Sequence, residues 1–284
     1  AIASEARDNA ADLARVTASF AKSGQGLESD ASRAEVEKLV RDGRVEQARG
    51  DFRVRSIELA ELLRLDGGTE LNPTEDAAAL IALADESAAG GELLLAALEN
   101  RPEVRQNDAL VKAARQRLRQ AKYDPFVPKV SVGFSAGGFG GGGGTSLGSE
   151  NDRHDFSALV FWQLENFGLG ARARAKEKKS RFKRAEIEQL RGLDRIASEV
   201  REAKTRAESR KRQLAIAEAA VMRAQSSFNL NKSRIYENQG LPIEVLQAID
   251  SLAMTRKLLL DGAVEFNQAQ FRLYTAIGQP ERTE

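Results

Sequence analysis

The chain has no cysteine, one histidine, six prolines and no long hydrophobic run among its 284 residues. Without cysteine there are no disulfide cross-links and no thiolate chemistry, although any cellular compartment remains possible. No stretch reaches the roughly 18 apolar residues of a membrane-spanning helix. The lone His154 lacks the partner ligands of a metal site, so we expect a surface histidine there.

The chain also has no excess of positive or negative charge. Lys and Arg total 43 against 42 Asp and Glu, so no broad attraction to nucleic acid is expected. We find no set of nucleophile, base and acid, and no carboxylate cluster of the hydrolase kind. The run Gly138–Gly143 matches a dinucleotide-binding glycine pattern, but "TSLGSENDRHD" follows it where a helix should open. We therefore expect no enzyme activity, no cofactor and no metal.

Two distant parts of the chain repeat each other. Residues 1–66 align with residues 215–280 at a constant offset of 214, without a gap, and "GQGLESDASRA" falls on "NQGLPIEVLQA". Chance similarity between two alanine-rich helices is the alternative, but it explains the aligned Gln-Gly-Leu breaks poorly. We interpret the pattern as an internal duplication.

Each repeat predicts a helical hairpin. Apolar residues recur at three-and-four spacing in both arms of the second copy, with Arg256 and Gln270 as polar members of the stripe, which is typical of a coiled-coil-like pair. Asn238 and Gly240 tolerate left-handed backbone, and Pro242 suits the first turn of the next helix. In the alignment of the two repeats, Gly24 occupies the position of Asn238. The Gln-Gly-Leu stretch is therefore predicted to be the hairpin tip.

The second hairpin has an unusually long first arm. From about residue 170 to 231 there is no proline and a single glycine, Gly192. Roughly 60 residues at 1.5 Å each give a helix of about 90 Å, which indicates a rod-like architecture. Ile216, Ala220 and Leu230 lie beside the main apolar stripe and indicate a second packing seam.

Two segments before this rod alternate like strands. "KVSVGFSAGG" places Val130, Val132 and Phe134 on one face, and "HDFSALVFWQLE" alternates in the same way. Each has roughly ten residues, the length that a tilted membrane strand needs. Because an isolated two-stranded hairpin is not stable in water, we expect it to pair with strands of other copies.

Three stretches of the chain carry a family resemblance, in this order: "LENRPEVRQNDALVKAARQRLRQAKYDPFVPKVSV", "VFWQLENFGLGARARAKEKKSRFKRAEIEQL" and "RIYENQGLPIEVLQAIDSLAMTRKLLLDGAVEFNQAQFRLYTAIGQP". With them the chain resembles the TolC-like outer-membrane efflux proteins. The resemblance implies a mainly α fold with long antiparallel coiled-coil-like hairpins forming a periplasmic α-barrel. One β-hairpin would contribute to a trimeric outer-membrane β-barrel.

The resemblance also divides the chain. Residues 1–75 would end the first repeat, 76–90 would be a linker, and 91–124 would be helices leading to the barrel. Residues 125–166 would be the outer-membrane β-hairpin with its Gly-rich loop, and 167–284 the long helix, tip turn and returning helix of the second repeat. Since the counterpart of residues 91–214 does not precede Ala1, and neither Met nor a signal peptide begins the chain, we expect a processed or truncated product lacking most of the first repeat.

The function implied is passive exit of solutes through the outer-membrane channel of a tripartite efflux or type I secretion system. The expected partners are two further copies in a homotrimer, a periplasmic adaptor, an inner-membrane pump and outer-membrane lipid, with no nucleic acid. The alternative from another class is a soluble coiled-coil scaffold or a periplasmic adaptor protein. Alternating strands of this length favour the channel.

Site residues follow from the resemblance. The acids after each tip, Asp30 and Glu244, would constrict the periplasmic entrance, although an acid in a first helical turn is also favoured by the helix dipole. We do not assign Tyr236 the role of a tyrosine that some family members place just before the tip, because Ile235 stands at that position. The tips themselves would dock the adaptor, unless their leucines only cap the turns. These tip residues are Gln25, Gly26, Leu27, Gln239, Gly240 and Leu241.

Two features near the strands concern the membrane. Phe161 and Trp162 would be membrane-interface anchors, with a hydrophobic plug under the barrel as the alternative. The basic run at residues 171–184 is interrupted by an acid and lies just after the strands. A solvated or headgroup-facing helix end therefore explains it better than nucleic-acid binding does.

Overall fold

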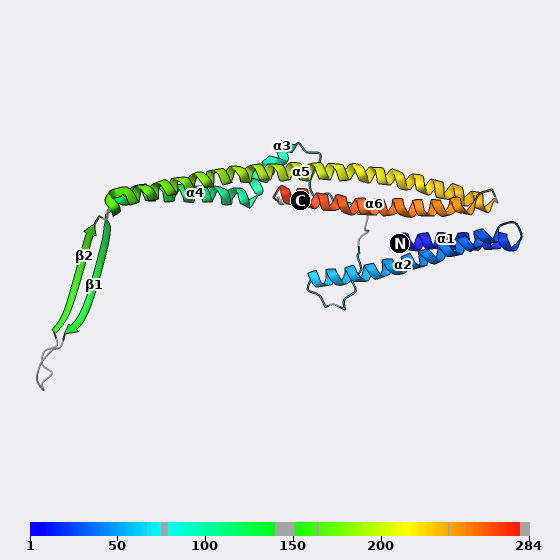
Figure 1. The fold of residues 1–284 in the computed structure, drawn as a ribbon, viewed down its shortest axis with the longest axis horizontal. Coiled ribbons are helices and arrows are strands. Elements are labelled where there is room, and N and C mark those ends of the chain that lie inside the picture. The colour runs from blue at the N-terminus through cyan, green and yellow to red at the C-terminus, as the bar shows by residue number, and fades with distance from the viewer. Residues whose placement is uncertain (67, 75–78, 140–150, 163–164, 238, 279–284) are drawn as a thin grey trace, which may run out of the picture. The chain divides into compact units, whose positions relative to one another are not determined.

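The computed structural model describes residues 1–66, 68–74, 79–139, 151–162, 165–237 and 239–278. The chain divides into two units, one of residues 1–93 with 199–284 and one of residues 94–198. Figure 1 shows the order of elements. The helices are α1 (Ile2–Lys22), α2 (Glu28–Leu62), α3 (Gly90–Asn100), α4 (Pro102–Tyr123), α5 (Leu169–Tyr236) and α6 (Pro242–Ala276). The strands are β1 (Lys129–Phe139) and β2 (Asn151–Phe161), flanked by the short 3-10 helices η1 (Asp124–Phe126) and η2 (Glu165–Gly168).

The first unit consists of two helical hairpins that repeat each other. α2 and α6 both have 35 residues, and their first and last positions differ by the offset of 214 found in the sequence. The ends of α1 and α5, at Lys22 and Tyr236, differ by the same offset. The predicted duplication is therefore matched by the bounds of the helices as well as by the two turns.

The core lies along the seams between these helices. The predicted apolar stripe of α5 and α6 is largely buried, and α1 and α2 contribute to the same cluster around the hairpin ends. Burying each large apolar side chain stabilises the pair by roughly 1.5–3 kcal/mol. Buried members of the stripe are Leu214, Ala217, Ala224, Phe228, Ile235, Val245, Ile249, Leu252, Ala263, Phe266, Leu273 and Ile277.

In the second unit, α4 lies antiparallel to the first part of α5. The guanidinium of Arg115 lies 5.5 Å from the ring centre of Phe182. Near the start of α4, a Cβ added at Gly192 would lie 2.5 Å from Nδ2 of Asn107. Gly192, one of the two glycines of α5, therefore lies where the side chain of Asn107 on α4 comes close to the α5 backbone.

The predicted strands pair as an antiparallel hairpin. The register places Val130 opposite Val160, Val132 opposite Ala158 and Phe134 opposite Phe156, which confirms a shared apolar face. All of these except Ala158 appear among the large exposed apolar side chains, with Val132 64% exposed. β2 ends at Phe161, so the alternation does not continue as strand to Trp162. The glycine run at 138–143 falls mostly outside the described residues.

No helix in the described part of the chain combines the length and the apolar character needed to cross a membrane.

Candidate functional site: the paired hairpin tips

The two tips share one hydrogen-bonding pattern. In the first, the carbonyl of Phe20 accepts from the backbone N–H groups of Gln25 and Gly26 at 2.9 and 3.0 Å. In the second, the carbonyl of Arg234 accepts from Gln239 and Gly240 at 2.8 and 3.1 Å. These bonds satisfy carbonyls that a helix end leaves without a partner. The sequence repeat therefore corresponds to a repeat of backbone geometry.

The reason for glycine at the second position of each Gln-Gly-Leu tip differs from the one that we predicted. Gly240 is not among the residues of positive φ; in the first tip that conformation belongs to Gly24, at φ 73°. A Cβ at Gly240 would instead lie 3.1 Å from Cβ of Arg234, and one at Gly26 would lie 2.9 Å from Cβ of Phe20. Close approach of the chain, rather than left-handed backbone, requires these two glycines. Asn238 lies outside the described residues.

A leucine precedes each returning helix. Leu27 and Leu241 have extended backbone and are 67% and 60% exposed. Their carbonyls accept from the backbone N–H groups of Asp30 and Glu244 at 3.1 and 3.0 Å. Both leucines therefore present their side chains outward at the two tips, as a contact surface would require.

The two tips enclose a common cavity of about 230 Å³. The first hairpin contributes Thr17, Phe20, Gln25, Gly26, Leu27 and Asp30, and the second contributes Ile235, Gly240, Leu241 and Pro242. Five of the six predicted tip residues therefore lie around one space. Both tips lie at the same end of the first unit.

The two predicted constriction acids differ in their surroundings. Glu244 is engaged in its own hairpin, where its carboxylate accepts from the backbone N–H of Leu241 at 3.4 Å and from Nη1 of Arg234 at 3.1 Å. Asp30 lines the shared cavity. Glu244 thus stabilises the first turn of its own helix, α6. A role in constriction stays a prediction for both acids.

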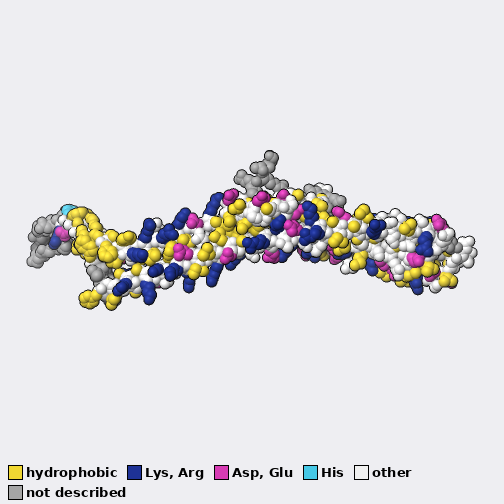
Figure 2. All heavy atoms as spheres, turned by 90° about the horizontal axis from the view of Figure 1, so that it is seen from above, with side chains coloured by type: hydrophobic (Ala, Val, Ile, Leu, Met, Phe, Trp, Pro, Cys, Tyr) yellow, Lys and Arg dark blue, Asp and Glu magenta, His cyan; other side chains and the backbone are white. Residues whose placement is uncertain are grey.

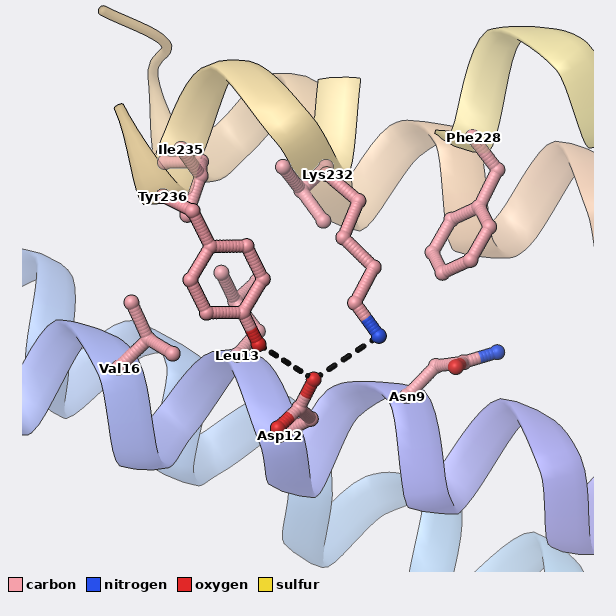
Figure 3. Close-up of a pocket in the computed structure, with 9 residues that line it drawn as sticks. Asn9, Asp12, Leu13, Val16, Phe228, Lys232, Ile235 and Tyr236 are labelled. Atoms are coloured by element: carbon pink, nitrogen blue, oxygen red, sulfur yellow. Dashed lines mark hydrogen bonds and ion pairs between the residues drawn. The ribbon is translucent and has the colours of Figure 1, made fainter. Parts of the chain in front are cut away.

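A polar link joins the last turn of α5 in the second hairpin to a point about three turns before the end of α1 in the first (Figure 3). The hydroxyl of Tyr236 donates to Oδ2 of Asp12 at 2.8 Å, and Nζ of Lys232 lies 2.9 Å from the same oxygen. Arg15 pairs with the other carboxylate oxygen at 2.5 Å. The hydrogen bond from Lys232 contributes most to lowering the pKa of Asp12 to about 2, against the opposing effect of burial. Burial and the nearby carboxylate raise the pKa of Tyr236.

Sequence reasoning missed this link. We did not single out Asp12, and we gave Tyr236 no role because it stands one residue from the family's tyrosine position. The available signal was the spacing of Lys232 and Tyr236, four residues apart beside the buried Phe228 and Ile235, which places both on the edge of the apolar seam.

Two arginines make further links between the hairpins. Arg41 of α2 is 1% exposed and donates to Oδ1 of Asp250 in α6 at 2.9 Å, while its other terminal nitrogen reaches Glu37 at 2.6 Å. Arg256 of α6 pairs with Glu5 of α1 and donates to Oε1 of Gln225 in α5 at 2.7 Å. Arg256, which we placed in the apolar stripe, therefore joins α1, α5 and α6.

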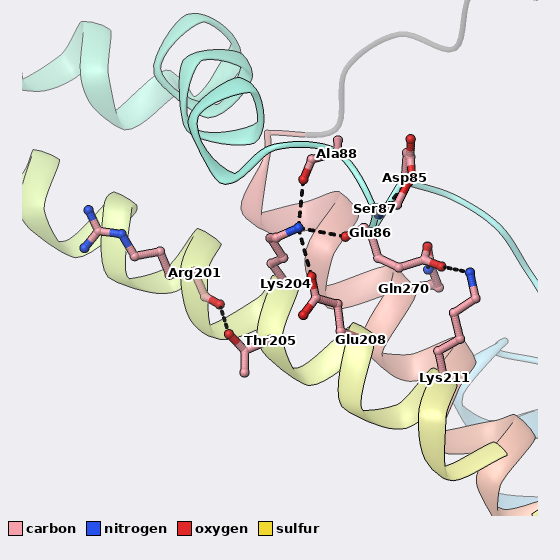
Figure 4. A network of polar contacts seen from close by, with 10 residues as sticks. All are labelled: Asp85, Glu86, Ser87, Ala88, Arg201, Lys204, Thr205, Glu208, Lys211 and Gln270. Atoms are coloured by element: carbon pink, nitrogen blue, oxygen red, sulfur yellow. Dashed lines mark hydrogen bonds and ion pairs between the residues drawn. The ribbon is translucent and has the colours of Figure 1, made fainter. Parts of the chain in front are cut away.

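The predicted linker is anchored to the second hairpin (Figure 4). Oε1 of the fully buried Gln270 accepts from the backbone N–H groups of Leu83 and Ala84, and its Nε2 donates to Glu86 at 2.8 Å. Lys211 pairs with the carboxylate of Glu86, and Lys204 donates to the backbone carbonyls of Glu86 and Ala88 at 2.9 and 2.7 Å.

These contacts bind both the backbone carbonyl and the carboxylate of Glu86 to side chains of α5 and α6. The pKa of Glu86 is lowered, because its bonds from Lys211 and Gln270 outweigh the effect of burial, which alone would raise it. Residues 79–88, which make up most of the described part (79–90) of the predicted linker, therefore form a clamp on α5 and α6.

The predicted membrane anchors lie at the base of the β-hairpin. Phe161 pairs with Lys129 in the register and is 42% exposed, and Trp162, which follows the strand, is 59% exposed. Because side chains alternate along a strand, Phe161 lies on the face opposite Val160. An anchoring role for the two aromatic residues stays a prediction.

A family model described as "Outer membrane efflux protein" matches residues 93–279. The comparison with curated proteins gives no significant match.

Solved structures are similar over nearly the whole chain. The outer-membrane channel OprN has 20% identity and a TM-score of 0.75, covering 98% of this chain and 61% of that one. CusC has 19% identity and a TM-score of 0.78, with 98% and 63% covered. VceC from Vibrio cholerae has 16% identity and a TM-score of 0.72, with 98% and 64% covered.

The chain thus spans less than two thirds of the length of these proteins, and at such identities the likeness shows the fold. The family model, in contrast, covers well over half of the chain. The protein belongs to the outer membrane efflux protein family.

Proposed function

We propose that the protein is the outer-membrane channel component of a tripartite efflux or type I secretion system. In this role it gives solutes a passive exit through a trimeric tube, with a helical portion in the periplasm. An inner-membrane pump supplies the energy, and a periplasmic adaptor links the pump to the helical end. The channel performs transport and no catalysis.

One observation carries this proposal: the β-hairpin exposes a continuous apolar face. Val130, Val132, Phe134 and Phe156 are between 64% and 73% exposed, and Val160 is 57% exposed. Two strands with such a face do not persist alone in water. Strands of 11 residues suit a bilayer, where pairing with strands of neighbouring copies satisfies their backbone edges.

The helices support side-by-side assembly in the same way. Along α5, Ile216, Met222 and Leu230 are at least 65% exposed, although the opposite side of the helix is packed against α6. α2 exposes a comparable row that includes Leu39, Val54 and Ile57. Apolar side chains repeated along a helix mark a packing face, so these rows fit neighbouring hairpins of an α-barrel.

The paired tips fit the periplasmic entrance. Both lie at one end of the hairpins, share a cavity and expose a leucine, so an adaptor can contact them together. We propose Gln25, Gly26, Leu27, Gln239, Gly240 and Leu241 as the adaptor-docking residues. Asp30 and Glu244, one turn further, are proposed to narrow the entrance.

Membrane insertion tests the proposal. Val132→Arg places a charge on the apolar face of the hairpin, which costs about 2–4 kcal/mol at the bilayer midplane. We expect this variant to be lost from the outer-membrane fraction and from the trimer seen by sizing in detergent. Ser131→Arg, which adds the same charge on the other face, is the matched control and should be tolerated better.

Recovery of the wild-type protein from the intact gene as a water-soluble monomer would contradict the proposal. It would favour the alternative of a soluble coiled-coil scaffold or a periplasmic adaptor. Equal behaviour of the two arginine variants would show that the apolar face does not contact lipid.

A further inference from the structure

The chain is nearly neutral as a whole, but one region is strongly basic. Residues 111–129 and 167–184 contain 14 lysines and arginines and only two acids, Asp124 and Glu177. The full chain has 43 basic against 42 acidic residues. We call this region, formed by the end of α4, the start of α5 and the chain between them and the strands, the basic collar.

The basic collar adjoins the β-hairpin. α4 ends at Tyr123 and α5 begins at Leu169, and short 3-10 helices connect both to the hairpin base, where Lys129 pairs with Phe161. The contact of Arg115 with Phe182 places the two helices antiparallel, so both carry their charge at the hairpin end. On the face in Figure 2, dark blue side chains gather over this part of the helices.

Pairing within the basic collar leaves most of the charge in place. Arg181 pairs with Glu177 at 2.5 Å, and Lys112 pairs with Asp108, just outside the collar, at 2.6 Å. Two acids cannot neutralise 14 cations in this stretch. An ordinary solvated helix mixes both signs along its surface, so an excess of this size indicates an anionic partner.

Exposed aromatic side chains mark the junction of the basic collar with the strands. Tyr123 is 64% exposed, Phe126 78% and Trp162 59%, and Phe167 is fully exposed. Phe167 also has a φ of 52°, an unfavourable backbone conformation for a bulky residue. Aromatic residues next to a basic segment are typical of the boundary between a bilayer and water.

We propose that the basic collar binds the phosphate headgroups of anionic phospholipids, with phosphatidylglycerol as the ligand class, at the surface of the membrane that the hairpin enters. The aromatic side chains settle at the boundary, and the cations reach the headgroups next to it. This inference rests on the proposed function, because it assumes that the hairpin lies in a bilayer.

Distance from the junction predicts which cations matter. Arg119, Lys122, Arg172 and Lys176 lie within about 11 Å of the helix ends nearest the hairpin, at 1.5 Å per residue. Lys112, Lys179, Lys183 and Arg184 lie about 15–22 Å away by the same rise. Since attraction to a charged surface decays over a Debye length of about 8–10 Å, the first group should bind lipid and the second should contribute little.

The test compares two variants of equal net charge, one with the four near cations changed to Gln and one with the four far cations changed to Gln. The trimer, purified in detergent, is titrated with phosphatidylglycerol and with phosphatidylethanolamine, and bound lipid is measured by native mass spectrometry. Each near cation contributes roughly a fivefold factor at most, so we expect the near variant to lose phosphatidylglycerol affinity at least about tenfold. The far variant should change less than about twofold.

Membrane recovery of the wild type and both variants is measured in parallel. A protein recovered with the membrane that shows no preference for phosphatidylglycerol, or equal losses in both variants, overturns the lipid site alone. Unchanged lipid affinity together with altered ion selectivity of the near variant in planar bilayers also overturns it, because the cations then face the lumen. A wild-type protein absent from the membrane overturns the inference and the proposed function together.

Discussion

Replacing Asp12 with asparagine tests how the two hairpins are held together. The substitution preserves the shape of the side chain and an oxygen that can accept from Tyr236, but it removes the charge that attracts Lys232 and Arg15. The pKa of Asp12 is lowered to about 2 from an ordinary value of 3.8. That difference corresponds to at most about 2 kcal/mol of stabilisation, because Lys232 and Arg15 are 37% and 75% exposed and solvent screens part of their attraction to Asp12.

Hydrogen–deuterium exchange of the helix backbone measures this effect locally. A loss of at most about 2 kcal/mol should accelerate exchange through opening of α1 from α5 by up to roughly 30-fold at neutral pH. Asp8→Asn is the matched control, because Asp8 lies on the same helix, is 66% exposed and pairs with the neighbouring Arg7. Exposed pairs of this kind contribute about 0–1 kcal/mol, so the control should change exchange little.

The pH dependence has a definite sign. Because the carboxyl pKa is lower in the folded than in the unfolded protein, its stabilisation is complete above about pH 4 and is lost as the pH falls toward about 2. Wild type and Asp12→Asn should therefore differ by a constant amount between about pH 5 and 8 and converge near pH 2. Equal exchange in the Asp12 and Asp8 variants at neutral pH would refute the link.

Two further substitutions test the tip and the clamp. Gly240→Val should destabilise the protein by about 1–3 kcal/mol in urea unfolding, because the added Cβ would lie 3.1 Å from Cβ of Arg234. Gly43→Ala is the control: a Cβ there has no neighbour within 4 Å, so this variant should be more stable than the wild type by about 0.5–1 kcal/mol. Full stability of the valine variant would show that the turn can widen. Gln270→Leu should leave two backbone N–H groups of the clamp without an acceptor, at about 1–3 kcal/mol, and expose residues 79–88 to limited proteolysis. Gln268→Leu is the control, because Gln268 is exposed. Equal proteolysis of the two variants would contradict the statement that Gln270 holds residues 79–88 in place.

The helices and the repeat were predictable because their signals are local. Periodicity identifies much of the buried face of α6, including Val245, Ile249 and Leu273, since a helix that packs on one side must keep its apolar residues there. It missed the neighbouring buried residues Leu246 and Ala248. The constant offset of 214 needs only a comparison of the chain with itself. The two strands and their apolar faces followed from strict alternation in two segments joined by a loop, whereas the register that pairs Val132 with Ala158 was not predicted.

The polar contacts were not predictable in the same way. Asp12 and Tyr236 are 224 residues apart, and nothing in either local pattern identifies the other. The clamp depends on backbone N–H groups of Leu83 and Ala84, which every sequence possesses, meeting one buried glutamine. A glycine at position 240 predicts that a side chain would not fit there, but the sequence does not distinguish a left-handed backbone from close contact with Arg234. Only the packed arrangement decides between the two.

The matched bounds of the two hairpins have an evolutionary consequence. Inserting one heptad into α6 and the paired part of α5 alone would shift the second turn by about 10 Å along the helices relative to the first, and the side chains that now line the shared space would no longer face one another. Lengthening is therefore tolerable only when both halves of the gene acquire it together. Relatives with longer or shorter periplasmic arms should show insertions and deletions in pairs, at positions separated by the repeat distance.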